Sequence, residues 1–135
     1  MTNIVEKYGK NAGKIWNTLS KHGSLTENTL IKKTGLNKED FYVAIGWLAK
    51  ENKIYFDEKN YSLGEYNWGE IIGKHAGKVW DIVHTCDEID IKYLPKLAGI
   101  PEEKTYCALG WLAREGKINA KRVRPRKTQT KITVN

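Results

Sequence analysis

The chain has 135 residues, a formal net charge of +7 and two cysteines, Cys86 and Cys107. No apolar run approaches the roughly 20 residues that a membrane-spanning helix needs. The first residues also lack the basic and apolar regions of a secretory signal, so we expect a cytoplasmic protein without membrane contact. Two cysteines outside any CxxC pair indicate neither a disulfide framework nor a zinc site, and we expect no metal and no cofactor.

The positive charge is concentrated at the end of the chain. Residues 1–64 carry ten Lys and seven acidic residues, whereas residues 65–120 carry seven basic and nine acidic residues. The last fifteen residues, 121–135, carry six Lys or Arg and no acidic residue. A polyanion would therefore meet the strongest positive field at this end of the chain.

The chain contains the same small domain twice. The stretch AIGWLAKENKI at residues 44–54 returns as ALGWLAREGKI at residues 108–118, an offset of 64. The stretch GKNAGKIW at residues 9–16 returns at the same offset as GKHAGKVW. A domain of this size buries only about 60% of the surface that its unfolded chain exposes. We therefore predict two domains, residues 1–64 and 65–135, that pack on each other or on a partner.

A long helix is expected to open each copy, with Asn3 and Asn67 as its N-cap residues. Apolar residues spaced by three and four positions predict one buried face. This face comprises Ile4, Tyr8, Ala12, Ile15 and Leu19 in the first copy, and Trp68, Ile72, Ala76, Val79 and Val83 in the second.

A second face of the same helix carries glycines and one tryptophan. It comprises Gly9, Gly13 and Trp16 in the first copy and Gly73, Gly77 and Trp80 in the second. A glycine inside a helix costs roughly 0.8–1 kcal/mol relative to Ala. We interpret this face as a groove that another backbone approaches closely, closed at one end by a tryptophan that we expect to be largely buried.

A short extended segment and a short helix follow in each copy. In the first copy the helix is capped by Thr26, and Gly35 and Gly99 are expected to end the two helices. Pro95 should delay the start of this helix in the second copy. The third helix is expected to begin at Asn37 or at Pro101. Four aromatic residues of this helix lie off its core face and predict a second buried surface, either between the repeats or in a dimer. They are Tyr42, Trp47, Tyr106 and Trp111.

A hairpin is expected to close each copy. Residues 53–63 form the first, with acidic residues in its turn, and residues 118–134 form a longer second hairpin with a basic turn. Three helices followed by a hairpin is the order of a winged helix-turn-helix domain. The predicted fold is therefore mainly helical with small hairpin wings, as tandem winged helix-turn-helix domains.

The two repeated motifs also resemble a known family. Gly-x-x-Ala-Gly-Lys-Ile/Val-Trp and Ala-Ile/Leu-Gly-Trp-Leu-Ala-Lys/Arg-Glu-x-Lys-Ile look like the small bacterial winged helix-turn-helix family once catalogued as a domain of unknown function. The resemblance covers most of residues 3–63 and 67–120, in tandem, but not the basic tail. It implies the winged helix fold and a presumed link to DNA, with no established activity.

Two functions remain open. The first is a non-enzymatic DNA-binding protein, with transcriptional regulation as a candidate role, that binds mainly through the second wing. The alternative is a protein-protein interaction module, with a protein partner or self-association through the off-core aromatic residues. No small-molecule substrate is evident. The candidate DNA-binding residues are Lys121, Arg122, Arg124, Arg126, Lys127 and Lys131 on the wing, and Lys38 and Lys104 at the starts of the third helices.

Overall fold

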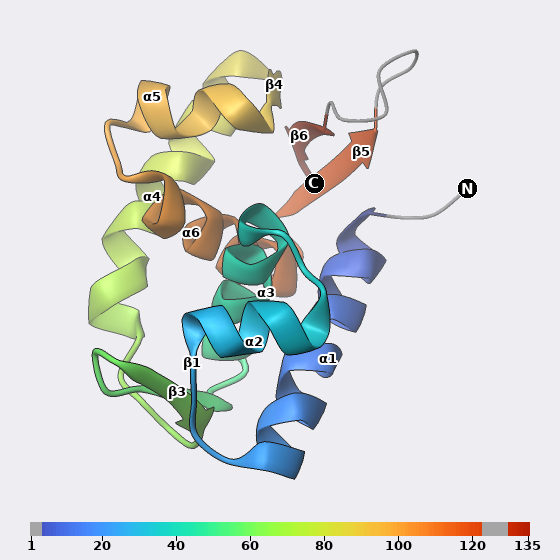
Figure 1. Cartoon of the computed structure of the whole chain (residues 1–135). Coiled ribbons are helices and arrows are strands. Elements are labelled where there is room, and N and C mark those ends of the chain that lie inside the picture. Colours follow the sequence, from blue (N-terminus) through green and yellow to red (C-terminus); the bar gives the residue numbers. More distant parts are fainter. Residues whose placement is uncertain (1–3, 123–129) are drawn as a thin grey trace.

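The computed structural model describes residues 4–122 and 130–135 of the chain, and it contains the same group of elements twice (Figure 1). The first copy comprises α1 (Ile4–His22), β1 (Leu25–Thr26), α2 (Glu27–Thr34), α3 (Lys38–Lys50), β2 (Ile54–Phe56) and β3 (Asn60–Leu63). The second comprises α4 (Gly69–Cys86), β4 (Glu88–Asp90), the 3-10 helix η1 (Ile91–Tyr93), α5 (Leu94–Ala98), α6 (Glu102–Arg114), β5 (Ile118–Arg122) and β6 (Thr130–Val134).

Each copy has a small antiparallel sheet. The strand orders are β1-β3-β2 and β4-β6-β5, so the short strand before the second helix joins the hairpin in both copies. This is the predicted fold class, mainly helical with two hairpin wings, and the prediction is confirmed. In the part of the chain that the structure describes, none of the helices is both long and apolar enough to cross a membrane.

The predicted core face of the first helix is buried in both copies, from Ile4 to Leu19 in α1 and from Trp68 to Val83 at the start of and along α4. Thr26 and Asn37 cap α2 and α3 by accepting backbone N–H groups, as predicted. The predicted Asn67 cap is wrong. Helix α4 begins at Gly69 without a side-chain cap, because Trp68 occupies the N-cap position. Asn3 lies outside the described residues.

Proline delays the second helix of the second copy, as predicted. Its first turn is the 3-10 helix η1, and α5 begins only at Leu94, with Pro95 in the first turn. The helix ends at Gly99, whose φ of 65° is left-handed. Glycine tolerates this conformation because it has no Cβ. Helix α5 is therefore shorter than its counterpart α2.

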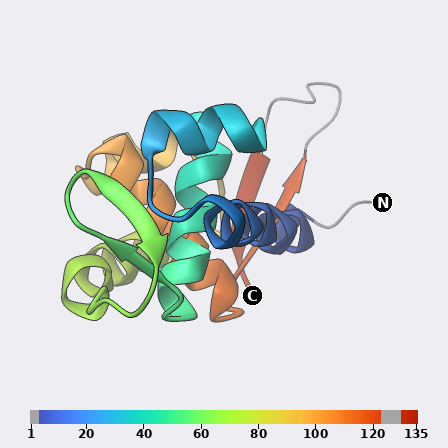
Figure 2. The same ribbon diagram turned by 60° about the horizontal axis from the view of Figure 1, so that its bottom comes forward.

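The third helices, α3 and α6, pack directly on each other at the centre of the molecule (Figures 1 and 2). A Cβ built on Gly46 would lie 1.8 Å from the backbone oxygen of Cys107. A Cβ on Gly110 would lie 1.8 Å from the backbone oxygen of Val43. Only glycine permits this approach, so these two residues set the distance between the two copies.

The contacts across this interface are reciprocal. Gly46 meets Cys107 and Gly110 meets Val43, which are the same pair of positions at the offset of 64. The ion pairs repeat the pattern, because Lys50 pairs with Glu115 at 3.6 Å, and Arg114 with Glu51 at 3.1 Å. Reciprocal contacts of this kind characterise a two-fold interface. The chain is therefore built like a two-fold dimer whose halves are joined by a short linker.

Helices α1 and α4 lie on opposite sides of the central pair, and each reaches the wing of the other copy (Figure 1). Helix α1 contacts β5 of the second wing. At the start of α4, the indole Nε1 of Trp68 donates a hydrogen bond to the carbonyl oxygen of Ile54 in β2, at 2.7 Å. Each copy therefore completes the packing of the other.

Candidate functional site

The helices that read DNA bases in helix-turn-helix proteins are largely buried here. Such a helix places its N-terminal residues on base edges in the major groove. In α3 every residue from Phe41 to Gly46 is buried, because α6 covers it. Lys38 and Lys104 are exposed in the first turns. Each is followed or preceded by acidic residues, which repel phosphates. The packing leaves the first turns of α3 and α6 at the surface, and each of these turns carries two carboxylates, which disfavours contact with DNA.

The described part of the second wing presents basic side chains on two adjacent strands. Lys121 on β5 and Lys131 on β6 are register partners, and Arg122 follows opposite Thr130. Lys121 and Arg122 are exposed, and the Nζ atom of Lys121 lies 3.7 Å from Glu88 Oε1. The other three candidate residues of this wing, Arg124, Arg126 and Lys127, lie outside the described residues.

Acidic residues lie near the base of this wing. Burial raises the pKa of Glu39, the neighbouring carboxylate of Asp40 raises it further, and Arg122 opposes the shift. Burial also raises the pKa of the Tyr8 phenol, and the same three charged residues act on it. Arg122 is therefore close enough to Glu39 and Tyr8 for its charge to act on both.

The four off-core aromatic residues lie at the contact between the copies. Tyr42 and Tyr106 are 9% and 4% exposed, and Tyr42 Oη donates a hydrogen bond to Glu27 Oε1 at 2.7 Å. Trp47 and Trp111 are half-buried, and each faces a cation from the opposite copy. The guanidinium carbon of Arg114 is 5.9 Å from the Trp47 ring centroid, and Lys50 Nζ is 5.0 Å from that of Trp111.

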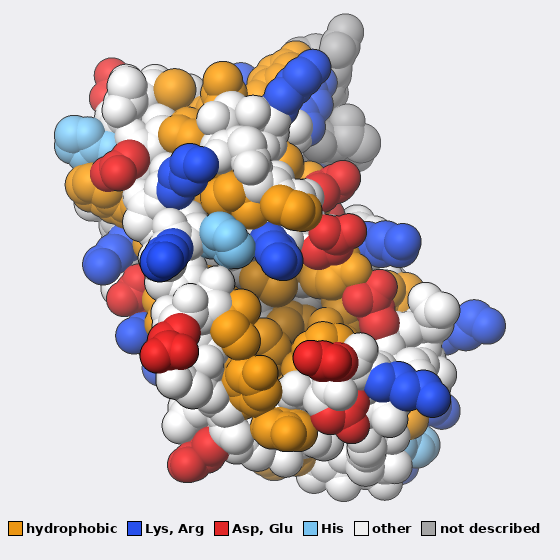
Figure 3. Space-filling model, turned by 90° about the vertical axis from the view of Figure 1, so that its left-hand side faces the viewer, with side chains coloured by type: hydrophobic (Ala, Val, Ile, Leu, Met, Phe, Trp, Pro, Cys, Tyr) orange, Lys and Arg blue, Asp and Glu red, His pale blue; other side chains and the backbone are white. Residues whose placement is uncertain are grey.

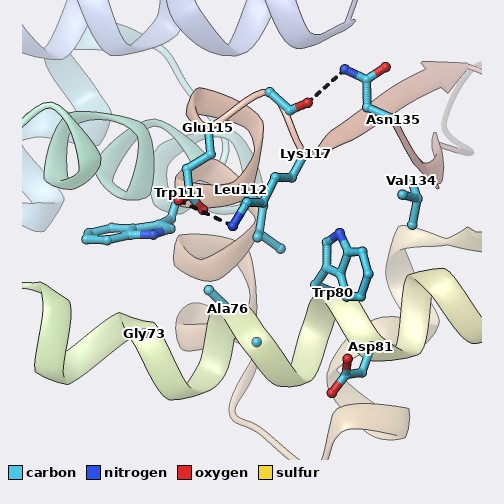
Figure 4. Close-up of a pocket in the computed structure, with 12 residues that line it drawn as sticks. Gly73, Ala76, Trp80, Asp81, Trp111, Leu112, Glu115, Lys117, Val134 and Asn135 are labelled. Carbon is cyan, nitrogen blue, oxygen red and sulfur yellow. Dashed lines mark hydrogen bonds and ion pairs between the residues drawn. The ribbon is translucent and has the colours of Figure 1, made fainter.

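Two grooves lie at equivalent places in the two copies. The first, of about 360 Å³, lies between α1 and the end of α3. The second, of about 630 Å³, lies between α4 and the end of α6 (Figure 4). Every residue that lines the first groove has a counterpart 64 positions later in the second, and only Asn17 and Asp81 differ in type. The identical pairs are Gly9/Gly73, Ala12/Ala76, Gly13/Gly77, Trp16/Trp80, Trp47/Trp111, Leu48/Leu112, Glu51/Glu115 and Lys53/Lys117.

The grooves are open, which corrects two predictions. Trp16 is 39% exposed and not largely buried, because no described segment covers the groove. A Cβ on Gly13, Gly73 or Gly77 would meet nothing within 4 Å, so the close backbone approach predicted at these glycines is wrong. Gly9 is different, since a Cβ there would lie 3.0 Å from the Trp47 ring.

Comparison with known families agrees with this architecture. A family model described as a winged helix-turn-helix domain (DUF2582) matches residues 1–67 and, a second time, residues 68–131. The chain belongs to this family. No curated protein and no solved structure matches it.

In this tandem member of the winged helix-turn-helix family, the described residues include no group of three or more His, Cys, Asp or Glu placed to hold a metal ion. Cys86 is exposed, whereas Cys107 is partly buried on α6. Burial raises the pKa of the Cys107 thiol to about 12, with the Glu103 and Glu27 carboxylates as smaller causes. Cys107 is therefore a thiol at neutral pH and a poor nucleophile.

Sequence reasoning missed the two residues that hold the copies together, Gly46 and Gly110. The signal was present, because a glycine lies in the middle of the third helix in both copies of the repeated motif. A glycine retained inside a helix indicates that something approaches the backbone there. The same reasoning, applied to the first helix alone, placed the close contact on the wrong element.

Proposed function

We propose that this protein is a non-enzymatic DNA-binding protein that contacts duplex phosphates mainly through its basic second wing. The observation that carries this proposal is the set of basic side chains on the two adjacent strands of the second wing, whereas the middles of α3 and α6 pack against each other. Lys121, Arg122 and Lys131 supply positive charge on that wing. The turn of the first wing instead contains Asp57 and Glu58.

Binding of this kind would depend weakly on DNA sequence. Contacts to phosphates position a protein on a duplex but carry no base information. A wing can also enter a narrow minor groove, where the negative potential is enhanced and attracts Arg and Lys. A role in transcription regulation would then need a partner or a DNA shape to supply specificity.

The test is a titration with mixed-sequence duplex DNA at several salt concentrations. The slope of log K against log salt should be about −0.9 per phosphate contact, so at most about −5 for six contacts. Changing Arg122, Arg124, Arg126 and Lys127 to Gln should keep the fold and remove most of the affinity and most of the slope. A matched control changes four exposed lysines elsewhere, Lys32, Lys33, Lys74 and Lys78, to Gln. No binding by the parent at low salt, or equal losses in both variants, would rule the proposal out.

The paired grooves favour a second candidate, a protein-interaction module. Eight of the nine residues that line the first groove are repeated without change in the second, which is larger and adds Gly116, Val134 and Asn135. Glu51 and Glu115 are already engaged in ion pairs across the interface, so their retention has a structural reason. The open space beside Gly13 and the exposure of Trp16 are not explained by contacts between the copies. Exposed apolar patches mark interaction surfaces.

Substitution of the groove tryptophans, the exposed Trp16 and the half-buried Trp80, tests this second candidate. The Trp16→Ala/Trp80→Ala double variant should lose much less stability than the roughly 3–5 kcal/mol of a fully buried tryptophan. It should also lose a discrete adduct that the parent forms on cross-linking, either with itself or with a partner protein. A Lys74→Ala/Lys78→Ala variant, altered on the exposed face of α4, is the control and should keep the adduct. An adduct that persists unchanged without the tryptophans would exclude the grooves as the contact.

A further inference from the structure

A third hollow, separate from the paired grooves, lies between the two copies at the end that carries the first wing (Figure 3). It is a cavity of about 500 Å³ with aromatic walls. The Phe56 and Tyr61 rings stack with their centroids 4.5 Å apart, and the Tyr66 and Trp68 rings meet at 5.1 Å. Ile72 of α4 also lines the cavity. The cavity is therefore lined by aromatic side chains from both copies.

The opposite end of the molecule shows why no side chain fills this cavity. Tyr8 of α1 occupies the position equivalent to Ile72 and is 2% exposed. The charged groups that act on the Tyr8 phenol are Glu39, Asp40 and Arg122. Their counterparts 64 positions away, Glu103, Lys104 and Glu58, all line the cavity. The Tyr8 ring thus fills one end of the molecule, and the shorter Ile72 leaves the equivalent space open at the other.

The aromatic walls are also confined to the open end. Phe56, Tyr61 and Trp68 correspond to Ala120, Ile132 and Ile4 in the opposite half, by the sequence offset and by the strand register. The two ends have therefore diverged in a coordinated way. One end combines a tyrosine with small and aliphatic residues, and the other combines an isoleucine with aromatic residues.

Negative charge predominates around the cavity. The lining includes three carboxylates, those of Glu27, Glu58 and Glu103, and one ammonium group, that of Lys104. Burial lowers the pKa of His75, and Lys104 and Lys78 lower it further, which favours the neutral imidazole. One oxygen of Glu27 accepts the Tyr42 hydrogen bond, which leaves its other oxygen for a ligand.

We propose that this cavity binds an organic cation with a flat aromatic body, its rings against the aromatic walls and its charge toward the carboxylates. The volume falls within the roughly 300–1,000 Å³ of small-molecule sites. Aromatic faces attract cations, and the carboxylates add to this attraction. An anion of the same shape would be repelled. The site does not include the second wing, so it is independent of DNA binding.

Two probes of matched shape and opposite charge test the site. Pyrenylmethylammonium and pyrenylacetate are titrated into the full chain, and pyrene emission, tryptophan quenching and the melting temperature are recorded. The cation should bind at least about tenfold more tightly than the anion, and it should raise the melting temperature. Equal affinity of the two probes, or no binding of either, would overturn the proposal.

Two variants locate the binding. Ile72→Tyr places the filling residue of the opposite end into the cavity and should weaken cation binding at least about tenfold. Leu97→Tyr, an exposed position on α5 outside the cavity, is the control and should bind like the parent. Glu27→Gln/Glu103→Gln should keep the cavity and bring the two probes to similar affinity. If Ile72→Tyr does not fold, the Glu27→Gln/Glu103→Gln variant is the test. An unchanged preference of that variant for the cationic probe would reject the site.

Discussion

Replacing Gly46 or Gly110 by alanine should destabilise the protein more than almost any other single-methyl change. The added Cβ would lie 1.8 Å from a backbone oxygen of the opposite copy, and for Gly46 two further backbone atoms lie within 2.9 Å. Backbone atoms of a packed helix cannot move away as the end of a side chain can. Relief of the clash requires α3 and α6 to separate, which opens the whole interface.

Overpacking of a core typically costs 1–3 kcal/mol, and we expect a loss of about 3 kcal/mol or more here because the collision is with backbone. Urea denaturation followed by circular dichroism measures the loss. The chain supplies matched controls in Gly13 and Gly77, where an added Cβ meets nothing within 4 Å. Alanine at either control site should stabilise the protein by up to about 1 kcal/mol, through helix propensity alone.

The prediction is a difference between two pairs of glycines, with Gly46 and Gly110 at the interface and Gly13 and Gly77 in the open grooves. A Gly46→Ala variant as stable as the parent would show that the helices do not cross at this distance. If Gly46→Ala and Gly13→Ala changed the free energy of unfolding equally, helix propensity alone would account for both effects. Loss of stability only at Gly46 and Gly110 would instead locate the interface where the structure places it.

The same glycines show how far sequence reasoning reaches in this protein. Periodicity predicted the core face of α1 and α4 correctly, because a helix buries one stripe and apolar residues must follow it. Local chemistry predicted the caps at Thr26 and Asn37 and the ends at Gly35 and Gly99, since these depend on a few adjacent residues. Such features are written in short stretches of sequence, and both copies repeat them.

The contact between copies could not be predicted in the same way. Gly13 and Gly46 are both helical glycines kept in the repeat, and nothing local distinguishes one that faces a backbone from one that faces an open groove. The cavity beside the first wing depends on α4 reaching the other copy, and its lining comes from segments between Glu27 and Cys107. The difference between Tyr8 and Ile72 explains the cavity only when the two ends of the folded molecule are compared.

Pairing α3 with α6 has a functional consequence. In helix-turn-helix proteins the second helix of the motif meets DNA, and here the corresponding helix, the third of each copy, serves as the interface between domains. An apolar second face on that helix stabilises the tandem arrangement and leaves only its ends at the surface. The surfaces that remain for partners are the wings, the paired grooves and the cavity, which is why the proposed functions rest on them.

Trp68→Ala should be the most damaging substitution outside the central crossing. Trp68 is 7% exposed, and its indole N–H donates to the Ile54 carbonyl of the first wing at 2.7 Å. Truncation of a buried tryptophan typically costs 3–5 kcal/mol. Trp68→Phe keeps most of the apolar contact but leaves the carbonyl without this donor, so its cost should be about 1–3 kcal/mol.

Two measurements distinguish a loss of this interdomain contact from a general loss of packing. Urea denaturation gives the free energy of unfolding, and limited proteolysis reports on the linker at residues 64–67. Because Trp68 ties the start of α4 to the first wing, Trp68→Ala should speed cleavage of the linker more than its loss of global stability explains. Trp16→Ala, a change at an exposed tryptophan of α1, is the control and should alter neither quantity much. If Trp68→Ala unfolds within about 1 kcal/mol of the parent and its linker stays protected, the hydrogen bond to Ile54 does not hold the two copies together.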